Sequence, residues 1–350
     1  MMRLIKVLFL LALSAGIAFG YGYFRLSAWS TMPRTMPEPQ EVDFERGSTL
    51  GGLASELAGK GIVDSAVFFR LWVRFFQPFQ KFQAGHYRFE GAVTPYGIAR
   101  DMLMGKVYQP VVLKYTIPEG FTLKQVAERL EAKGLGTKKL ILALATKKSF
   151  LKAQRISAPS LEGYIYPKTY DFVVFPTAEI ALARAVEVFW QNLPPQYEQD
   201  LKGLGLTLHQ AVTIASLIEL EAVHDDEKPM ISEVIWRRLK DRVPLAIDAA
   251  IIYGIKDYTG DIRMKDLRDA SNPYNTRIHG GLPPTPIGSP SVSSLKAVLT
   301  PSQKGYYYYV LRTDGSQRHY FTKTLSEHEK YVRELVRATK KDGFQKSNPK

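Results

Sequence analysis

The chain of 350 residues is 45% hydrophobic and 23% charged, so it can bury the cores of two or three domains and is neither disordered nor collagen-like. Lysine and arginine outnumber aspartate and glutamate by 47 to 34, and the net charge of +13 favours an anionic partner. The sequence has no cysteine and six scattered histidines, which excludes disulfides and thiol nucleophiles and predicts no metal site.

An uncharged apolar run occupies residues 7–24, after two basic residues. As a helix its 18 residues extend roughly 27 Å, enough to cross the hydrocarbon core of a bilayer. Three aromatic residues lie at its far end, as in an interfacial belt: Tyr21, Tyr23 and Trp29. We predict a cytoplasmic stub and a single signal-anchor helix within residues 1–29; a signal peptide cleaved at residues 18–20 is the alternative. In both cases the rest of the chain works outside the cytoplasm, where an anionic envelope polymer is a better partner than nucleic acid.

A proline-rich linker is predicted over residues 30–42, and an internal repeat with an offset of 73 residues follows it. The two copies, 44–62 and 117–135, are identical at seven pairs of positions: Gly47/Gly120, Thr49/Thr122, Leu50/Leu123, Ala54/Ala127, Leu57/Leu130, Lys60/Lys133 and Gly61/Gly134. Each copy predicts a strand, a glycine turn, a Ser/Thr cap, an amphipathic helix and a glycine stop. The apolar residues of this helix have core spacing, so we expect them to pack rather than bind.

Further elements follow from periodicity and turn residues. A strand is predicted over 84–89, helices over 95–104 and around 138–154, and a hairpin with core aromatics over 161–172. A capping box at 207–210 opens a helix that runs to about Val223, and a second helix begins near Asp226. Residues 244–292 predict mostly loop. The chain then predicts a β-hairpin over 306–321, a helix from about Ser326 and a basic tail over 336–350.

The helix that opens at residue 207 is apolar around nearly its whole circumference, which predicts burial, yet it carries Glu219 and Glu221. The two glutamates are about 200° apart on the helical wheel, so they cannot act as a pair. Loss of hydration beside small apolar neighbours would disfavour the ionised form of Glu219. A protonated carboxyl near neutral pH is what glycosidic bond cleavage needs. The alternative is a structural ion pair with Arg237 or Arg238 on the next helix.

A second group of polar residues lies on proline- and glycine-rich segments: Asp248, then residues 271–276 and 280–287. Amides, hydroxyls and aromatic faces on such loops suit a sugar polymer. Ordinary turn chemistry, in which Asn and Pro serve the backbone, is the alternative.

Seven segments in order resemble the endolytic murein (lytic) transglycosylases of the YceG-like family, from the membrane helix to about residue 335. These are residues 84–89, 161–170, 215–221, Asp248 with 253–254, 273–276, 281–287, and 321–328. The resemblance implies an α+β fold: the membrane helix, a LysM-like peptidoglycan-binding module over 43–110, and a mixed α+β catalytic domain over 111–335.

The resemblance also implies a reaction. It is cleavage of the β-1,4 bond between N-acetylmuramic acid (MurNAc) and N-acetylglucosamine (GlcNAc) in nascent glycan strands, which leaves 1,6-anhydroMurNAc ends and terminates strand elongation. The implied partners are glycan strands and the peptidoglycan polymerases of the elongation machinery. The implied location is the inner (cytoplasmic) membrane, crossed once, with the catalytic domain on the periplasmic side. No cofactor is expected.

By the same resemblance Glu219, the first glutamate of a Glu-x-Glu pair, is catalytic. We expect substrate binding by Ser216, Glu221, Asp248, Tyr253, Tyr274, Asn275, Thr276 and Leu282. The chain departs from the family pattern at Leu220, Ala246, Ala249, Arg277 and Thr285, which flank the catalytic position. Two alternatives stay open: a hydrolytic muramidase with Asp248 as second carboxylate, and a non-catalytic wall-binding scaffold in which Glu219 is structural.

Overall fold

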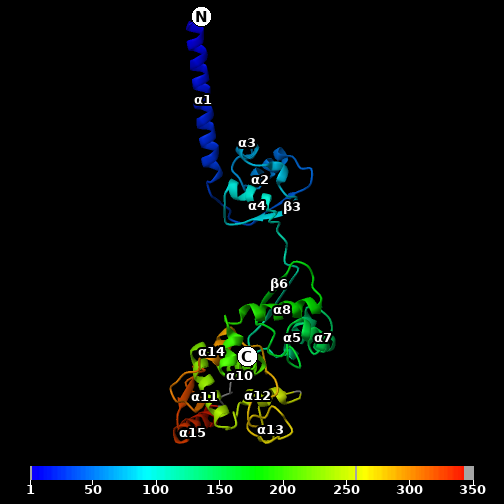
Figure 1. Ribbon diagram of the computed structural model, residues 1–350, viewed down its shortest axis with the longest axis vertical. Coiled ribbons are helices and arrows are strands. Elements are labelled where there is room, and N and C mark those ends of the chain that lie inside the picture. Colours follow the sequence, from blue (N-terminus) through cyan, green and yellow to red (C-terminus); the bar gives the residue numbers. More distant parts are fainter. Residues whose placement is uncertain (1, 257, 343–350) are drawn as a thin grey trace. The chain divides into compact units, whose positions relative to one another are not determined.

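The computed structural model describes residues 2–256 and 258–342, and these residues fall into two compact units, the first ending at Pro110 and the second beginning at Val111 (Figure 1). Both units mix helices with two-stranded antiparallel sheets, so the predicted α+β class is confirmed. Each unit has its own core of buried apolar side chains.

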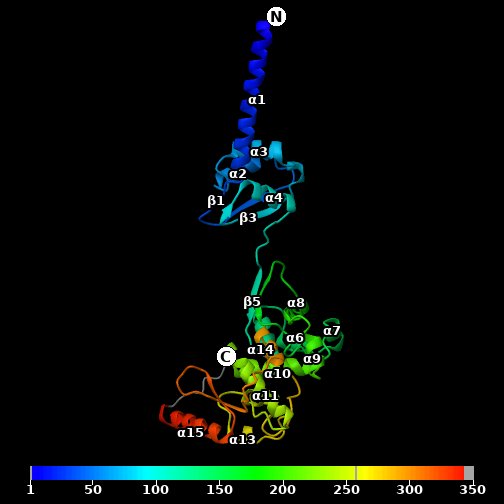
Figure 2. The same ribbon diagram turned by 60° about the vertical axis from the view of Figure 1, so that its left-hand side comes forward.

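The first unit begins with the long helix α1 (Met2–Ser30), drawn in dark blue in Figure 2. Within it, Lys6–Ser30 is long and apolar enough to cross a membrane, with a mean hydropathy of 1.8 and none of its most apolar window buried. Its last turn contacts the rest of the unit, because the Trp29 indole donates a hydrogen bond to Asp64 at 2.7 Å. These features are consistent with single-pass anchoring.

The body of the first unit follows a strand–helix–helix–strand order. Its two outer strands, β2 (Gln40–Phe44) and β3 (Gly85–Phe89), pair antiparallel with Val42 opposite Tyr87. The remaining elements are β1 (Arg34–Thr35) paired with β4 (Ala92–Val93), α2 (Leu50–Gly59), α3 (Ala66–Phe76), η1 (Phe79–Lys81) and α4 (Pro95–Met104). The predicted strand over 84–89 and helix over 95–104 are confirmed.

The second unit opens with the same kind of arrangement. β5 (Leu113–Ile117) pairs antiparallel with β6 (Lys168–Phe172), and between them lie α5 (Leu123–Ala132), α6 (Lys138–Ala145) and α7 (Lys148–Ala153). The hairpin predicted over 161–172 is therefore wrong. Its first half is a turn in which Gly163, at φ +83°, lies too close to Pro286 for a side chain. Its second half is β6, and the aromatic side chains of Tyr164 and Tyr170 are in the core, as predicted.

The internal repeat is confirmed in three dimensions. The bounds of β2 and α2 plus 73 give the bounds of β5 and α5. In both copies a threonine at the N-cap, Thr49 or Thr122, accepts a hydrogen bond from the backbone N–H three residues later. Local sequence therefore sets the same strand, turn and capped helix twice.

The rest of the second unit surrounds α10 (Leu208–Glu221), whose residues 211–218 are all buried, as its apolar circumference predicts. α10 contacts α9 (Tyr197–Gly203), α11 (Lys228–Lys240), α12 (Asp248–Gly254) and α14 (Val292–Leu299). The other elements are α8 (Ala178–Asn192), η2 (Asp225–Glu227), α13 (Met264–Leu267), the hairpin β7 (Tyr308–Leu311) and β8 (His319–Thr322), and α15 (Leu325–Asp342). The region 244–292 is mostly loop, as predicted, but it includes α12 and α13. Of the predicted basic tail, residues 336–342 continue α15, and residues 343–350 lie outside the described residues.

Candidate functional site

Glu219 lies in the last turn of α10, and its side chain is 8% exposed. One carboxylate oxygen, Oε2, accepts hydrogen bonds from the Ser291 N–H at 2.8 Å, the Ser291 hydroxyl at 2.5 Å and the Ser294 hydroxyl at 2.6 Å. Ser291 is the N-cap of α14, so the carboxylate lies at a helix N-terminus, where the free N–H groups and the helix dipole favour negative charge. The local geometry thus fixes both the position and the orientation of this carboxyl.

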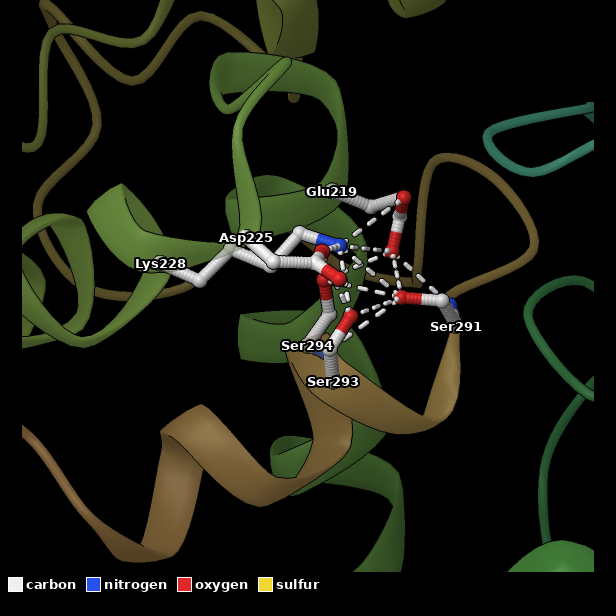
Figure 3. Close-up of polar contacts among 6 residues, drawn as sticks. All are labelled: Glu219, Asp225, Lys228, Ser291, Ser293 and Ser294. Atoms are coloured by element: carbon white, nitrogen blue, oxygen red, sulfur yellow. Dashed lines mark hydrogen bonds and ion pairs between the residues drawn. The ribbon is translucent and has the colours of Figure 1, made fainter.

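Lys228, the first residue of α11, is the second partner of Glu219 (Figure 3). Its ammonium is 3.3 Å from both Glu219 oxygens and 2.8 Å from Asp225, and it also donates to the hydroxyls of Ser291 and Ser293. The Lys228 side chain is 4% exposed, whereas that of Asp225 is 75% exposed. Hydrogen bonds from Lys228 and then Ser293 hold the pKa of Asp225 below its ordinary value.

Two expectations about Glu219 are corrected here. Its carboxyl is surrounded by hydrogen-bond donors rather than by the apolar surface that helical spacing predicts, because the N-terminus of α14 brings serines to it. An ion pair does form, but with Lys228. The guanidinium of Arg237 instead approaches Glu233 at 3.9 Å, and that of Arg238 donates to backbone carbonyls of residues 245 and 307.

Glu221 and Asp248 belong to a different cluster, centred on Tyr309 of β7. Burial, together with the charge and hydrogen bond of Glu221 and the charge of Asp248, raises the pKa of the Tyr309 hydroxyl well above its ordinary value. Asp248, at the start of α12, accepts two hydrogen bonds from Arg277, the shorter at 2.8 Å. Arg277, one of the expected departures from the family pattern, is thus the ion-pair partner of Asp248.

Three of the predicted substrate-binding residues are buried and engaged within the protein. Ser216 accepts from the N–H of Ile287, Thr276 bonds both backbone groups of Ile247, and the Asn275 amide donates to carbonyls of residues 266, 267 and 269. Their exposed fractions are 2% or less. In the structure these residues hold the loops between α12 and α14, and direct substrate contact by them stays a prediction.

The remaining predicted residues line two other places. Tyr253 and Tyr274 have ring centroids 4.8 Å apart, and the Tyr274 hydroxyl is 2.9 Å from that of Thr285, another departure from the family pattern. Leu282 lines a cavity of about 790 Å³ beside the first half of α10, together with His209, Trp236, Arg237 and eight other residues.

Sequence reasoning missed Glu162, which is 3% exposed. Its carboxylate accepts from the N–H of Leu123, the first residue of α5, at 3.0 Å and from the Tyr253 hydroxyl at 2.8 Å. Burial raises the pKa of Glu162 to about 7, against the opposing effect of these hydrogen bonds. The sequence feature that could have identified Glu162 is the one that identified Glu219: a carboxyl residue within an apolar segment, here one that is also rich in aromatic residues.

The cluster around Glu219 combines a fixed carboxyl, a buried ammonium and three hydroxyls. These donors suit a carboxylate that accepts a proton, and the proton donation that glycosidic cleavage needs is part of the proposed function. The sequence also missed Lys228, Asp225, Ser291, Ser293 and Ser294. Among residues 2–256 and 258–342, no group of three or more His, Asp or Glu side chains is arranged to hold a metal ion.

Comparisons with known proteins bear on the whole chain. The YceG-like family matches residues 42–334. The endolytic murein transglycosylase of Bacillus subtilis is 28% identical over an alignment of 309 positions that covers 83% of this chain and 84% of that protein. The protein of the same name from Streptococcus pneumoniae serotype 2 is 26% identical over 94% of this chain and 64% of its own length. The crystal structure of a YceG-like protein from Listeria monocytogenes superposes with a TM-score of 0.57 at 30% identity, over 84% of this chain and 99% of that one.

Proposed function

Since the chain belongs to the YceG-like family, which confirms the resemblance of its motifs, we propose that it is an endolytic murein transglycosylase. Its substrate is the peptidoglycan glycan strand. The bond cleaved is the β-1,4 linkage between MurNAc and GlcNAc in nascent strands, and the product carries a 1,6-anhydroMurNAc end. Strand elongation ends with this cleavage.

The observation that carries the proposal is the setting of Glu219. Three donors from the start of α14 and one from Lys228 converge on a carboxyl that is 8% exposed. A structural carboxylate can have such partners too, but this one occupies the position that the family resemblance gives to the catalytic glutamate. We therefore assign the proton transfers to Glu219.

The reaction needs one carboxyl. Protonated Glu219 donates its proton to the glycosidic oxygen while the bond from that oxygen to C1 of MurNAc breaks. The resulting carboxylate accepts the proton of the C6 hydroxyl, whose oxygen bonds to C1 and closes the anhydro ring. Glu219 ends protonated, and water is not consumed. A second carboxylate to activate water, as in hydrolases, is not required.

The hydrolytic alternative assigns water activation to Asp248. Its pairing with Arg277 at 2.8 Å and its place beside Tyr309 rather than in the Glu219 cluster do not support that role. We propose that sugar contacts the exposed atoms of five residues: Glu221, Asp248, Tyr253, Tyr274 and Leu282. The buried Ser216, Asn275 and Thr276 hold the loops that present them.

The first unit supplies attachment in this proposal. Helix α1 anchors the chain in the cytoplasmic membrane, and the residues that follow it lie on the outer side. Residues 43–110 form a LysM-like module that binds peptidoglycan. A cavity of about 490 Å³ supports this assignment, because it combines the aromatic side chains of Phe44 and Phe79 with polar groups such as Arg46 and Gln83.

The proposal is tested by the purified full-length protein, reconstituted in vesicles and given uncrosslinked nascent glycan. The Glu219→Gln variant keeps the size of the side chain but has no transferable proton, so turnover should fall by about 10²–10⁴-fold. Glu221→Gln is the matched control on the same helix and should lose much less. Equal losses in the two variants, or a fully active Glu219→Gln, would contradict the assignment, and an inactive wild type would favour the scaffold alternative.

A further inference from the structure

Lys228 is an ammonium in an unusual position, because a side chain that is 4% exposed loses nearly all of its hydration. Such burial is costly unless the charge is paired and hydrogen-bonded. Lys228 satisfies this condition with oxygens from four residues: Glu219, Asp225, Ser291 and Ser293 (Figure 3). The ammonium is thus held between one buried carboxylate and one exposed carboxylate.

The Lys228 ammonium and the Asp225 carboxylate have opposite electrostatic effects at Glu219. The Lys228 ammonium, 3.3 Å away, stabilises the ionised form of Glu219. Asp225 is closer to Lys228, at 2.8 Å, and its negative charge offsets part of that stabilisation. A balance of this kind matters for a residue that must first donate a proton and then accept one.

We propose that Lys228 and Asp225 form a positioning pair that sets the pH range over which Glu219 transfers its proton. The inference rests on the proposed function and extends it to two residues that act through Glu219 and are not expected to contact the sugar. In this account Lys228 also aligns the Ser291 and Ser293 hydroxyls at the N-terminus of α14.

The other charged groups near this end of α10 have partners of their own. Glu221 bonds Tyr309, Asp248 of α12 pairs with Arg277, Asp226 pairs with Arg318, and Glu227 pairs with His319. The groups of α14 that contact Glu219 are serines, which carry no charge. Helix α9 precedes the first turn of α10, whereas Glu219 lies in the last turn of α10. Glu233 of α11 accepts from Ser302 and from the N–H groups of residues 304 and 305, and His224 bonds the carbonyl of Ser316. Among the described residues, Lys228 is the charged group paired with Glu219, and Asp225 is the second carboxylate paired with Lys228.

The proposal predicts that substitutions of Lys228 and of Asp225 shift the pH dependence of activity in opposite directions. Activity requires protonated Glu219, so the alkaline limb of kcat/KM against pH reports its deprotonation in the free enzyme. Lys228→Met removes the positive charge and should move this limb to higher pH. Asp225→Asn leaves the Lys228 charge uncompensated and should move the limb to lower pH.

The experiment compares wild type, Lys228→Met, Asp225→Asn and Asp226→Asn in the reconstituted full-length chain. Asp226→Asn is the matched control, because Asp226 is the adjacent aspartate but pairs with Arg318 at 2.8 Å, and its limb should not move. Opposite shifts in the first two variants support the proposal. Shifts of the same sign, or a shift in Asp226→Asn equal to that in Asp225→Asn, would overturn it. Because the Asp225 side chain is 75% exposed, Asp225→Asn should fold. If Lys228→Met does not fold, the shift in Asp225→Asn decides the outcome.

A second readout does not depend on activity. In protein labelled with ¹³C at glutamate carboxyls, the signal that disappears in Glu219→Gln reports the ionisation of Glu219 directly. The pH dependence of this signal should shift in the same directions in Lys228→Met and Asp225→Asn as the pH dependence of activity does. An inactive wild type with opposite shifts in this signal would contradict the proposed function and keep the pair, whereas an active wild type with an unmoved signal would contradict the pair alone.

Discussion

The two copies of the internal repeat have the same local structure but different surroundings. In the first copy, the turn between β2 and α2 at Gly47 and Ser48 lines a cavity of about 490 Å³. In the second, the corresponding turn at Gly120 and Phe121 exchanges two backbone hydrogen bonds with Ser289, each 2.8 Å long. One turn therefore lines an open surface, and the other supports a loop.

The supported loop leads directly to the candidate active site. Ser289 is two residues before Ser291, whose N–H and hydroxyl both donate to Glu219. The start of α5 is further tied by Glu162, which accepts from Leu123 and from Tyr253 of α12. A repeated sequence thus determines an element, while contacts made by residues far away in the chain determine how that element is used.

Among the tests of this comparison, we expect substitution of Glu162 to have the largest effect on the unfolding free energy. Its pKa is about 7 in the folded protein and about 4.5 when unfolded, so the folded state binds the proton more tightly. The resulting stabilisation is complete below pH 4.5, is lost as the pH rises to about 7, and amounts to about 3 kcal/mol. Glu162→Gln should abolish this pH dependence, as measured by urea unfolding of the second unit within the full-length chain in detergent.

The first copy supplies the control for that measurement. Glu56 on α2 forms a solvent-exposed pair with Lys60, so Glu56→Gln should change the unfolding free energy of the first unit by less than about 1 kcal/mol at any pH. A second-unit pH dependence that survives Glu162→Gln would show that another group carries it.

Gly288 tests the link between the second copy and the site. A Cβ atom at this position would lie 2.5 Å from the carbonyl oxygen of Gly120, and backbone must shift to admit it. Gly288→Ala should therefore destabilise the second unit by about 1–3 kcal/mol and lower turnover, because the loop that carries Ser291 is displaced. Gly280→Ala, where a Cβ would meet nothing within 4 Å, is the control and should be close to wild type in stability and turnover.

The sequence predicted the features that depend on neighbouring residues. The repeat, the caps at Thr49 and Thr122, the capping box of α10 and the C-terminal hairpin are encoded within a few residues each, and all are present. The partners of Glu219 could not be predicted in the same way. Lys228 is nine residues away across a turn, and the serines are more than 70 residues away, so only the packing of α14 against α10 brings them to the carboxyl.

We expect substitutions of the two threonine caps to have the smallest effect on stability. Each substitution should destabilise the unit that contains its copy of the repeat. Thr49→Ala and Thr122→Ala each remove a side chain that accepts a backbone hydrogen bond at the helix start, which should cost about 1 kcal/mol. Calorimetry of the full-length chain should show Thr49→Ala lowering the transition of the first unit alone, and Thr122→Ala that of the second. A single variant that lowers both transitions equally would mean that the copies do not unfold as parts of separate units.

The central claim is that Glu219 closes the C6 hydroxyl onto C1 without water. The most direct test is cleavage of nascent glycan by the wild-type protein in H₂¹⁸O, followed by mass spectrometry of the released muramoyl ends. The account predicts anhydro ends that contain no ¹⁸O and are absent with Glu219→Gln. Reducing ends that incorporate one ¹⁸O would contradict it and support the hydrolytic mechanism.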